Sequence, residues 1–111
     1  MSASSVELRR SERLAVKVKV TYQSLDDFLS DYTANVSLGG MFIQTERPLA
    51  KGSRFRLRFD IPGHARPVET TATVRWVQQG ADGLTAGMGV VFDELTDVEQ
   101  RRVASWLADI E

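Results

Sequence analysis

The segment Arg54-Phe55-Arg56-Leu57-Arg58-Phe59-Asp60-Ile61 has the clearest structural pattern in this 111-residue chain. Charged and apolar side chains alternate along it, and a period of two residues is typical of a β-strand with one buried face. The apolar residues are expected to face a core. The three arginines are expected to face water as a solvated strand surface. Pro62-Gly63 then ends the strand.

Similar segments on both sides of this one predict further strands. We expect them at residues 16–22, 32–36, 41–45, 68–77 and 86–92, separated by short connections that contain glycine, proline or aspartate. In the strand at 68–77, Trp76 follows the alternation of Ala72 and Val74, so it is expected to lie in the core. The acidic segment 23–31 is expected to be turn-like, with Phe28 and Leu29 in a short helical turn.

The periodicity changes near the C-terminus. Thr96-Asp97-Val98-Glu99 has the spacing of a capping box, in which a hydroxyl and a carboxylate cap the first turn of a helix. An apolar stripe at helical spacing follows, formed by Val103, Trp106, Leu107 and Ile110. Six short strands followed by a helix predict an all-β fold, a six-stranded antiparallel barrel with a C-terminal α-helix. Closing the barrel would leave no exposed strand edge.

Composition limits the class of protein. An apolar content of 42%, a charged content of 26% and a net charge of -1 are typical of a soluble globular domain and do not suggest a protein that binds DNA through bulk charge. The chain has no cysteine and a single histidine, His64, which is expected to lie in an exposed loop. No apolar run is long enough for a membrane span or a signal peptide, so a cytoplasmic location is expected.

We expect one domain, with residues 1–6 as a disordered tail and residues 7–111 as the folded unit. No metal site is expected, because Asp26, Asp27 and Asp31 lack the full spacing of a calcium loop. No catalytic residue is expected either, because Ser37 has neither the Gly-x-Ser-x-Gly context nor a partner histidine. The sequence therefore favours a binding protein over an enzyme.

Two short polar motifs are the candidate binding site. The first, Arg9-Arg10-Ser11-Glu12-Arg13, offers guanidinium groups, which match phosphates and the O6/N7 edge of guanine. The second is Asn35-Val36-Ser37-Leu38-Gly39-Gly40. Asn35 and Ser37 are two residues apart, so in an extended chain their side chains would share a face. The two glycines permit positive φ and would let a ligand approach the backbone closely.

Together these motifs resemble the signature of the PilZ family, an Arg-x-x-x-Arg segment followed by Asp/Asn-x-Ser-x-x-Gly on a barrel. The resemblance covers roughly residues 7–110. It implies a non-catalytic receptor for cyclic di-GMP that needs no other cofactor. The ligand-binding residues that it implies are Arg9, Arg10, Arg13, Asn35, Ser37, Gly39 and Gly40, and Arg75 is a weaker candidate because it points outward beside Trp76.

The resemblance also implies a mechanism. An arm at residues 7–14 would be mobile without ligand and would close over the dinucleotide, creating a surface for a partner in motility, envelope or regulatory machinery. Two alternatives stay open: a PilZ-like interaction module that does not bind the nucleotide, and a small barrel that binds single-stranded nucleic acid. The second predicts exposed aromatic residues on the strands. Most aromatic residues here are expected to face inward, which counts against it.

Overall fold

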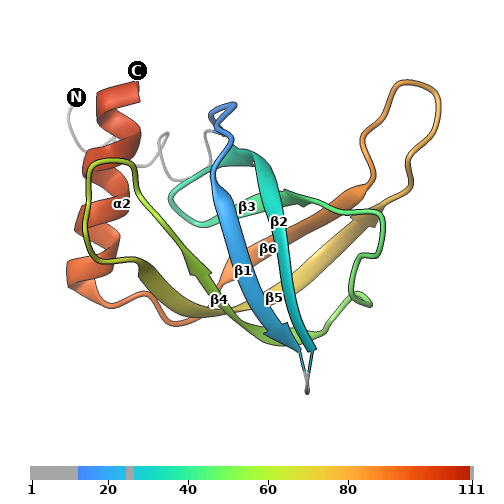
Figure 1. Cartoon of the computed structure of the whole chain (residues 1–111), viewed down its shortest axis with the longest axis horizontal. Helices are drawn as coiled ribbons and strands as arrows, with labels where there is room; N and C mark the ends of the chain where they lie inside the picture. Colours follow the sequence, from blue (N-terminus) through green and yellow to red (C-terminus); the bar gives the residue numbers. More distant parts are fainter. Residues whose placement is uncertain (1–12, 25–26, 111) are drawn as a thin grey trace.

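The computed structural model describes residues 13–24 and 27–110, which form six antiparallel strands and one helix (Figure 1). These elements are β1 (Lys19–Ser24), β2 (Asp27–Val36), β3 (Gly40–Gln44), β4 (Arg54–Phe59), β5 (Val68–Gln78), β6 (Gly87–Phe92) and α2 (Asp97–Ile110). The strands close into a barrel in the order β1-β2-β3-β6-β5-β4. The predicted all-β barrel with a C-terminal helix is therefore confirmed.

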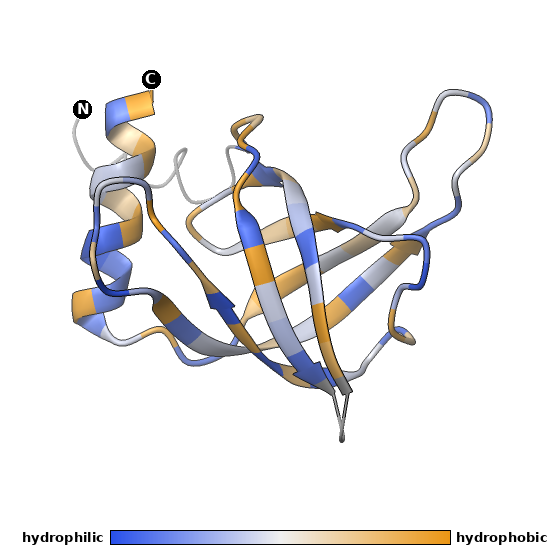
Figure 2. Ribbon diagram, viewed as in Figure 1, coloured by the Kyte–Doolittle hydropathy of each residue, from blue (hydrophilic) through white to orange (hydrophobic). Residues whose placement is uncertain are grey.

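Alternation along the strands builds the core. In β4, Phe55, Leu57 and Phe59 are buried and the arginines between them are exposed, as the sequence predicts. Figure 2 shows hydrophilic and hydrophobic residues alternating along β1 and β4. The inward residues of all six strands form one apolar cluster with the buried residues of the helix. Burial of this apolar surface is the main force that holds the barrel together.

Helix α2 packs through one face, and the predicted N-cap is present. The Glu99 amide donates a hydrogen bond of 3.1 Å to Thr96 Oγ1. The reciprocal half of the capping box is not formed, because the Glu99 carboxylate accepts instead from Arg102 Nη1 at 2.7 Å. Val103, Trp106 and Leu107 of the predicted stripe are buried, whereas Ile110 in the last turn is 44% exposed.

Arg102 fastens α2 to the barrel. Its guanidinium donates to the backbone carbonyls of Arg66 and Pro67 in the connection between β4 and β5. Figure 1 shows this connection running beside the helix. His64 in the same connection is exposed, as predicted, with Nδ1 3.5 Å from Arg102 Nη2. In the described part of the chain, no helix is long and apolar enough to cross a membrane.

The turn predicted for residues 23–31 is wrong, because most of that segment belongs to a long β1–β2 hairpin. Phe28 pairs with Gln23 in the ladder and is 80% exposed. Asp31 points toward the interior, and its carboxylate accepts a 2.7 Å hydrogen bond from the Tyr22 hydroxyl. Phe28 faces outward and Asp31 inward, which is the reverse of the usual polarity of a strand. The segment therefore does not show the usual alternation in its sequence.

The first strand also begins later than residue 16. The Thr33 hydroxyl accepts from the Val18 amide at 3.0 Å and donates to the Val16 carbonyl at 2.5 Å. A side chain therefore replaces part of the backbone ladder before Lys19. The remaining predicted strand ends lie within two residues of the observed ones, except that β2 starts five residues earlier than predicted.

Candidate functional site

Two β-bulges change which residues face outward on the barrel wall near the Asn-x-Ser-x-x-Gly motif. The β2–β3 register shifts between Thr33 and Asn35, and the β5–β6 register shifts between Val74 and Trp76. An extra residue in a strand moves the residues after it to the opposite face. Thr33 and Val74, before the bulges, are buried. Asn35 and Trp76, where the register resumes, lie on the outer face.

The two bulges lie in one transverse row of the barrel. Asn35 is paired with Phe42 of β3, Phe42 with Gly89 of β6, and Gly89 with Trp76 of β5. Residues directly opposite one another in an antiparallel ladder share a face. The row therefore carries an amide at one end and an indole at the other, with a phenyl ring between them.

Trp76 is a correction to the sequence prediction, because it is 40% exposed and does not lie in the core. Its ring packs against Phe42, with the centroids 5.1 Å apart and the planes tilted by 31°. Glycine at 89 makes room for it, because a Cβ there would lie 2.8 Å from Trp76 Cδ1 and overlap the rest of the ring edge. Gly87 likewise leaves room for Phe42. Phe42 is 3% exposed, so the exposed ring of this row is Trp76, at the opposite end from Asn35.

Arg13, the last residue of the arginine motif, contacts the Asn35 end of this row. Its Nη1 donates a hydrogen bond of 2.9 Å to Asn35 Oδ1, across 22 residues of sequence. The next residue, Leu14, makes two backbone hydrogen bonds of 2.9 Å with Val36, one in each direction. The end of the arm is thus fixed to the end of β2. Arg9 and Arg10 of the same motif lie outside the described residues, as do the predicted tail at 1–6 and Asp26.

Ser37 does not share an open face with Asn35, because β2 ends at Val36. Ser37 is only 4% exposed, and both of its donors are directed at one acceptor. Its amide lies 2.8 Å from Gly40 O, and its hydroxyl lies 3.3 Å from the same oxygen. Ser37 therefore closes the turn between β2 and β3.

The glycines of the motif also serve the barrel. Gly40 is buried and does not have positive φ, and glycines with positive φ in the described residues are Gly52, Gly63 and Gly83. A Cβ at Gly40 would overlap Val90 O and lie 3.1 Å from Val90 C in the neighbouring strand. Gly39 is exposed, and its carbonyl accepts a hydrogen bond of 3.0 Å from the Phe92 amide. Strand packing is therefore the reason for glycine at position 40.

Arg75 lies in the β5 bulge next to Trp76 and is exposed, as predicted. It has no polar partner among the residues that the structure describes. A further cation, Lys17, lies on the outer surface with Nζ 5.0 Å from the centroid of the Tyr32 ring. No group of residues that could hold a metal ion occurs within residues 13–24 and 27–110.

Three aromatic residues on the strands are exposed: Phe28, Tyr32 and Trp76. No pattern in the sequence marked Phe28 as exposed, because acidic residues precede it. None marked Trp76, because a bulge has no clear sequence signature. Most of the other aromatic residues are buried, as expected. The aromatic argument against a nucleic-acid-binding barrel is therefore weaker than the sequence suggested.

The chain is thus a closed antiparallel barrel with a guanidinium, an amide and an indole along one row of its outer wall. The chain belongs to the PilZ domain family, whose model matches residues 7–109. This family comprises ligand-binding regulatory domains and receptors for cyclic di-GMP. Comparison with curated proteins finds no match.

Solved structures share the fold. The inhibitor of motility MotI/DgrA from Bacillus subtilis is 20% identical with a TM-score of 0.75, over 85% of this chain and 46% of that protein, so this chain spans less than half of its length. The PilZ domain of YcgR from Escherichia coli, solved with c-di-GMP, is 19% identical with a TM-score of 0.67, over 86% of each chain. The PilZ domain of CeSA from a cellulose-synthesizing bacterium is 13% identical with a TM-score of 0.66, over 90% of this chain and 98% of that one.

Proposed function

We propose that this domain is a receptor for cyclic di-GMP and that the nucleotide binds on the outer wall at Arg13 and Asn35. The observation that carries the proposal is the hydrogen bond between these residues, which joins the two PilZ motifs at one place. Membership of a family of cyclic di-GMP receptors supports it, as does the fold shared with the YcgR domain solved with that nucleotide.

The chemistry of the site suits this ligand. Cyclic di-GMP offers two phosphates and two guanines, and a guanidinium can make paired hydrogen bonds with either group. We assign this role to Arg13 and to Arg9 and Arg10 of the same motif. Asn35 would contribute an amide, which both donates and accepts. Trp76 adds an exposed ring on which a guanine can stack, with Arg75 beside it as a second contact.

Ser37, Gly39 and Gly40 would act on the ligand mainly through the shape of the turn. Ser37 fixes the chain reversal after Asn35, and Gly40 lets β3 approach β6 closely. Both features hold the Asn35 amide at the end of the aromatic row. We expect substitutions at these three positions to change nucleotide affinity through the position of Asn35.

The signal would be an ordering of the arm. Arg13 and Leu14 are already anchored on β2, so a ligand-driven change would involve the residues that precede them. With the arm closed over the nucleotide, the domain would present a new surface to a protein of motility, envelope or regulatory machinery. We infer a cytoplasmic location as part of the same proposal.

Isothermal titration calorimetry with cyclic di-GMP tests this function. We expect saturable binding by the wild type and at least tenfold weaker binding by Arg13→Ala, because a paired contact to guanine is worth about 1–3 kcal/mol. Trp76→Ala should also weaken binding about tenfold, since stacking on an aromatic ring contributes about 1–3 kcal/mol per base. Arg101→Ala, in an exposed position of α2, is the matched control and should bind as the wild type does.

Circular dichroism of each variant separates loss of binding from loss of fold. A folded wild type without saturable binding would favour an interaction module that does not use the nucleotide. Equal affinities of the wild type and Arg13→Ala would place the ligand elsewhere and contradict the site.

A further inference from the structure

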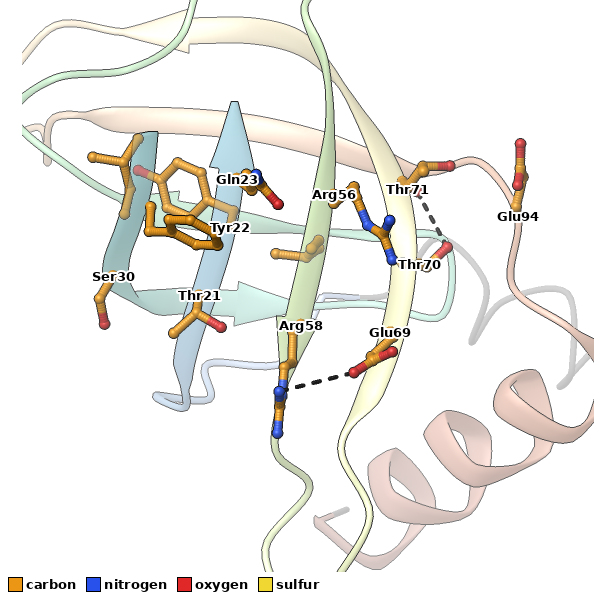
Figure 3. A pocket seen from close by; sticks show the side chains of 13 residues that line it. Thr21, Tyr22, Gln23, Ser30, Arg56, Arg58, Glu69, Thr70, Thr71 and Glu94 are labelled. Carbon is orange, nitrogen blue, oxygen red and sulfur yellow. Dashed lines mark hydrogen bonds and ion pairs between the residues drawn. The ribbon is translucent and has the colours of Figure 1, made fainter. Parts of the chain in front are cut away.

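The barrel has a second surface feature on the wall away from the Asn35 row. A groove of about 850 Å³ runs over the outer faces of β1, β4 and the first halves of β2 and β5 (Figure 3). In the closed strand order, β2 and β5 separate β1 and β4 from β3 and β6 on both sides. Ser30 in the groove and Asn35 are five residues apart on β2, about 16 Å at the usual rise per residue.

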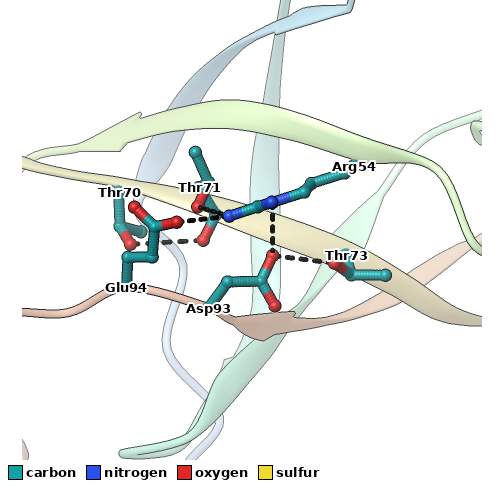
Figure 4. A network of polar contacts seen from close by, with 6 residues as sticks. All are labelled: Arg54, Thr70, Thr71, Thr73, Asp93 and Glu94. Atoms are coloured by element: carbon teal, nitrogen blue, oxygen red, sulfur yellow. Dashed lines mark hydrogen bonds and ion pairs between the residues drawn. The ribbon is translucent and has the colours of Figure 1, made fainter.

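The groove contains an arginine without a carboxylate partner. Arg54 is paired with Asp93 at 3.4 Å and with Glu94 (Figure 4). Arg58 is paired with Glu69 at 3.9 Å, as the dashed line in Figure 3 shows. Arg56, between these two in β4, is exposed and makes no ion pair within the described parts of the chain. The three arginines of β4 are exposed, as the sequence predicts. The sequence did not predict that Arg54 and Arg58 are ion-paired and that Arg56, among the described residues, is not.

An exposed aromatic residue lies in the same row as Arg56. The ladder pairs Phe28 with Gln23, Gln23 with Arg56, and Arg56 with Thr71. Phe28 and Arg56 are thus two strands apart, about 10 Å at the usual strand spacing. Phe28 is 80% exposed, the highest fraction among the large apolar residues that the structure describes. Aromatic residues and arginine are the types most enriched where protein interfaces gain their affinity.

We propose that this groove binds an acidic segment of a partner protein, with a carboxylate on Arg56 and an apolar side chain on Phe28. Charge complementarity supports this partner, because Arg56 makes no ion pair within the described residues, whereas the groove carboxylates Glu69 and Glu94 are paired with other arginines. Guanidinium groups pair with carboxylates through two parallel hydrogen bonds. An apolar neighbour of that carboxylate would cover the Phe28 ring.

The acidic residues at the groove favour a protein over a nucleic acid. Glu69 and Glu94 line the same groove as Arg56. A nucleic acid carries a negative charge at every phosphate, whereas Arg56 is a single unpaired cation among the described residues here, because Glu94 and Glu69 already pair with Arg54 and Arg58. A peptide varies in charge from residue to residue, so a neutral or basic residue can lie opposite these carboxylates. The inference is independent of the nucleotide, since the groove and the Asn35 row lie on different walls.

Photo-crosslinking identifies the partner segment. The full-length protein carrying p-benzoylphenylalanine in place of Phe28 is irradiated in its own cells, and the crosslinked segment is identified by mass spectrometry. We expect a segment with at least two carboxylates next to an apolar residue. That segment, made as a labelled peptide, then serves as the probe for fluorescence anisotropy with the purified protein in the absence of cyclic di-GMP.

Charge reversal at Arg56 tests whether this residue recognises the acidic peptide. Arg56→Glu should weaken peptide binding at least tenfold, and a peptide with its acidic residues replaced by lysine should regain affinity for that variant. Arg101→Glu, an exposed reversal on α2, is the control and should leave binding unchanged. A segment without acidic residues, equal binding by Arg56→Glu, or no crosslink at position 28 would overturn the proposal. Displacement of the peptide by a fifteen-nucleotide oligo(dT) that binds this groove more tightly would also overturn it, in favour of a nucleic-acid partner.

Discussion

Gly40 and Gly89 lie in the same β3–β6 ladder, and alanine at each should have a different effect on stability. At Gly40 the added Cβ would meet backbone atoms of the neighbouring strand, overlapping Val90 O and lying 3.1 Å from Val90 C. Carbon atoms in contact normally lie about 3.5–4.0 Å apart. The overlap with Val90 O is the larger of the two, so the strands must separate by about 1 Å or more. A backbone atom has no alternative rotamer.

The expected cost of Gly40→Ala follows from what that separation breaks. Gly39 O, next to the substituted residue, is the acceptor for the Phe92 amide of β6 at 3.0 Å. Losing this bond costs about 1 kcal/mol. Disturbed packing of the fully buried Met41 adds about 1–3 kcal/mol. We expect a loss of about 2–4 kcal/mol from the free energy of unfolding.

Gly89→Ala should be much milder. The atoms in its way belong to the Trp76 side chain, which is partly exposed and can rotate off the wall. The loss is the ring pair with Phe42, worth about 0.5–1.5 kcal/mol, and reduced freedom of the unfolded chain returns about 0.4–1 kcal/mol. We expect a net change below about 1 kcal/mol. Nucleotide affinity should nevertheless fall, because the proposed stacking surface is displaced.

Urea denaturation followed by circular dichroism measures both free energies. The reasoning would be refuted if Gly40→Ala stayed within 1 kcal/mol of the wild type, or if Gly89→Ala were the more destabilised of the two. Acrylamide quenching of tryptophan fluorescence provides the internal check. Trp76 should become more accessible in Gly89→Ala, while the buried Trp106 stays protected.

Two further predictions concern stability. Burial and the adjacent Asp31 carboxylate raise the pKa of the Tyr22 phenol above its usual value. A raised pKa in the folded state stabilises the fold below the unfolded pKa of about 10 and loses that effect as the pH rises further. The free energy of unfolding should therefore fall above about pH 10, and more steeply for the wild type than for Tyr22→Phe, in urea titrations at several pH values; equal slopes would contradict this cause. Thr96→Ala should lower the free energy of unfolding by about 1 kcal/mol through loss of the N-cap to the Glu99 amide, measured by thermal denaturation, and an unchanged melting temperature would show that the cap contributes nothing.

Much of the fold could be predicted because burial imposes a period on the sequence. The alternation of β4 and the stripe of α2 follow directly from one buried face each. The β1–β2 hairpin could not be predicted in the same way. Asp31 faces inward because Tyr22 satisfies its carboxylate, and that partner becomes visible only when the two strands are paired.

The sequence singled out the two motifs of the candidate site, but the geometry around them could not be predicted. Arg13 and Asn35 come from different motifs, and the structure joins them by a hydrogen bond. The face on which Trp76 lies depends on a bulge, and an added residue leaves no mark in the alternation up to Val74. The role of Gly40 depends on how near β6 comes, which is a property of strand packing. The motifs can therefore be recognised from residue spacing alone. Which of their groups meet depends on the register of the paired strands.

The anchored end of the arm has a consequence for affinity. Ordering a free segment costs about 1–2 kcal/mol per residue in backbone entropy. Arg13 and Leu14 are already held by three hydrogen bonds to β2. These two residues are therefore ordered before the ligand binds, and binding loses no further backbone entropy there. A bound nucleotide would have to compete with Asn35 for the Arg13 guanidinium, which exchanges one hydrogen bond for a charge-assisted pair with phosphate or guanine. Arg13 is therefore pre-positioned to recruit the ligand, and the arginines before it would gain contacts at the expense of ordering.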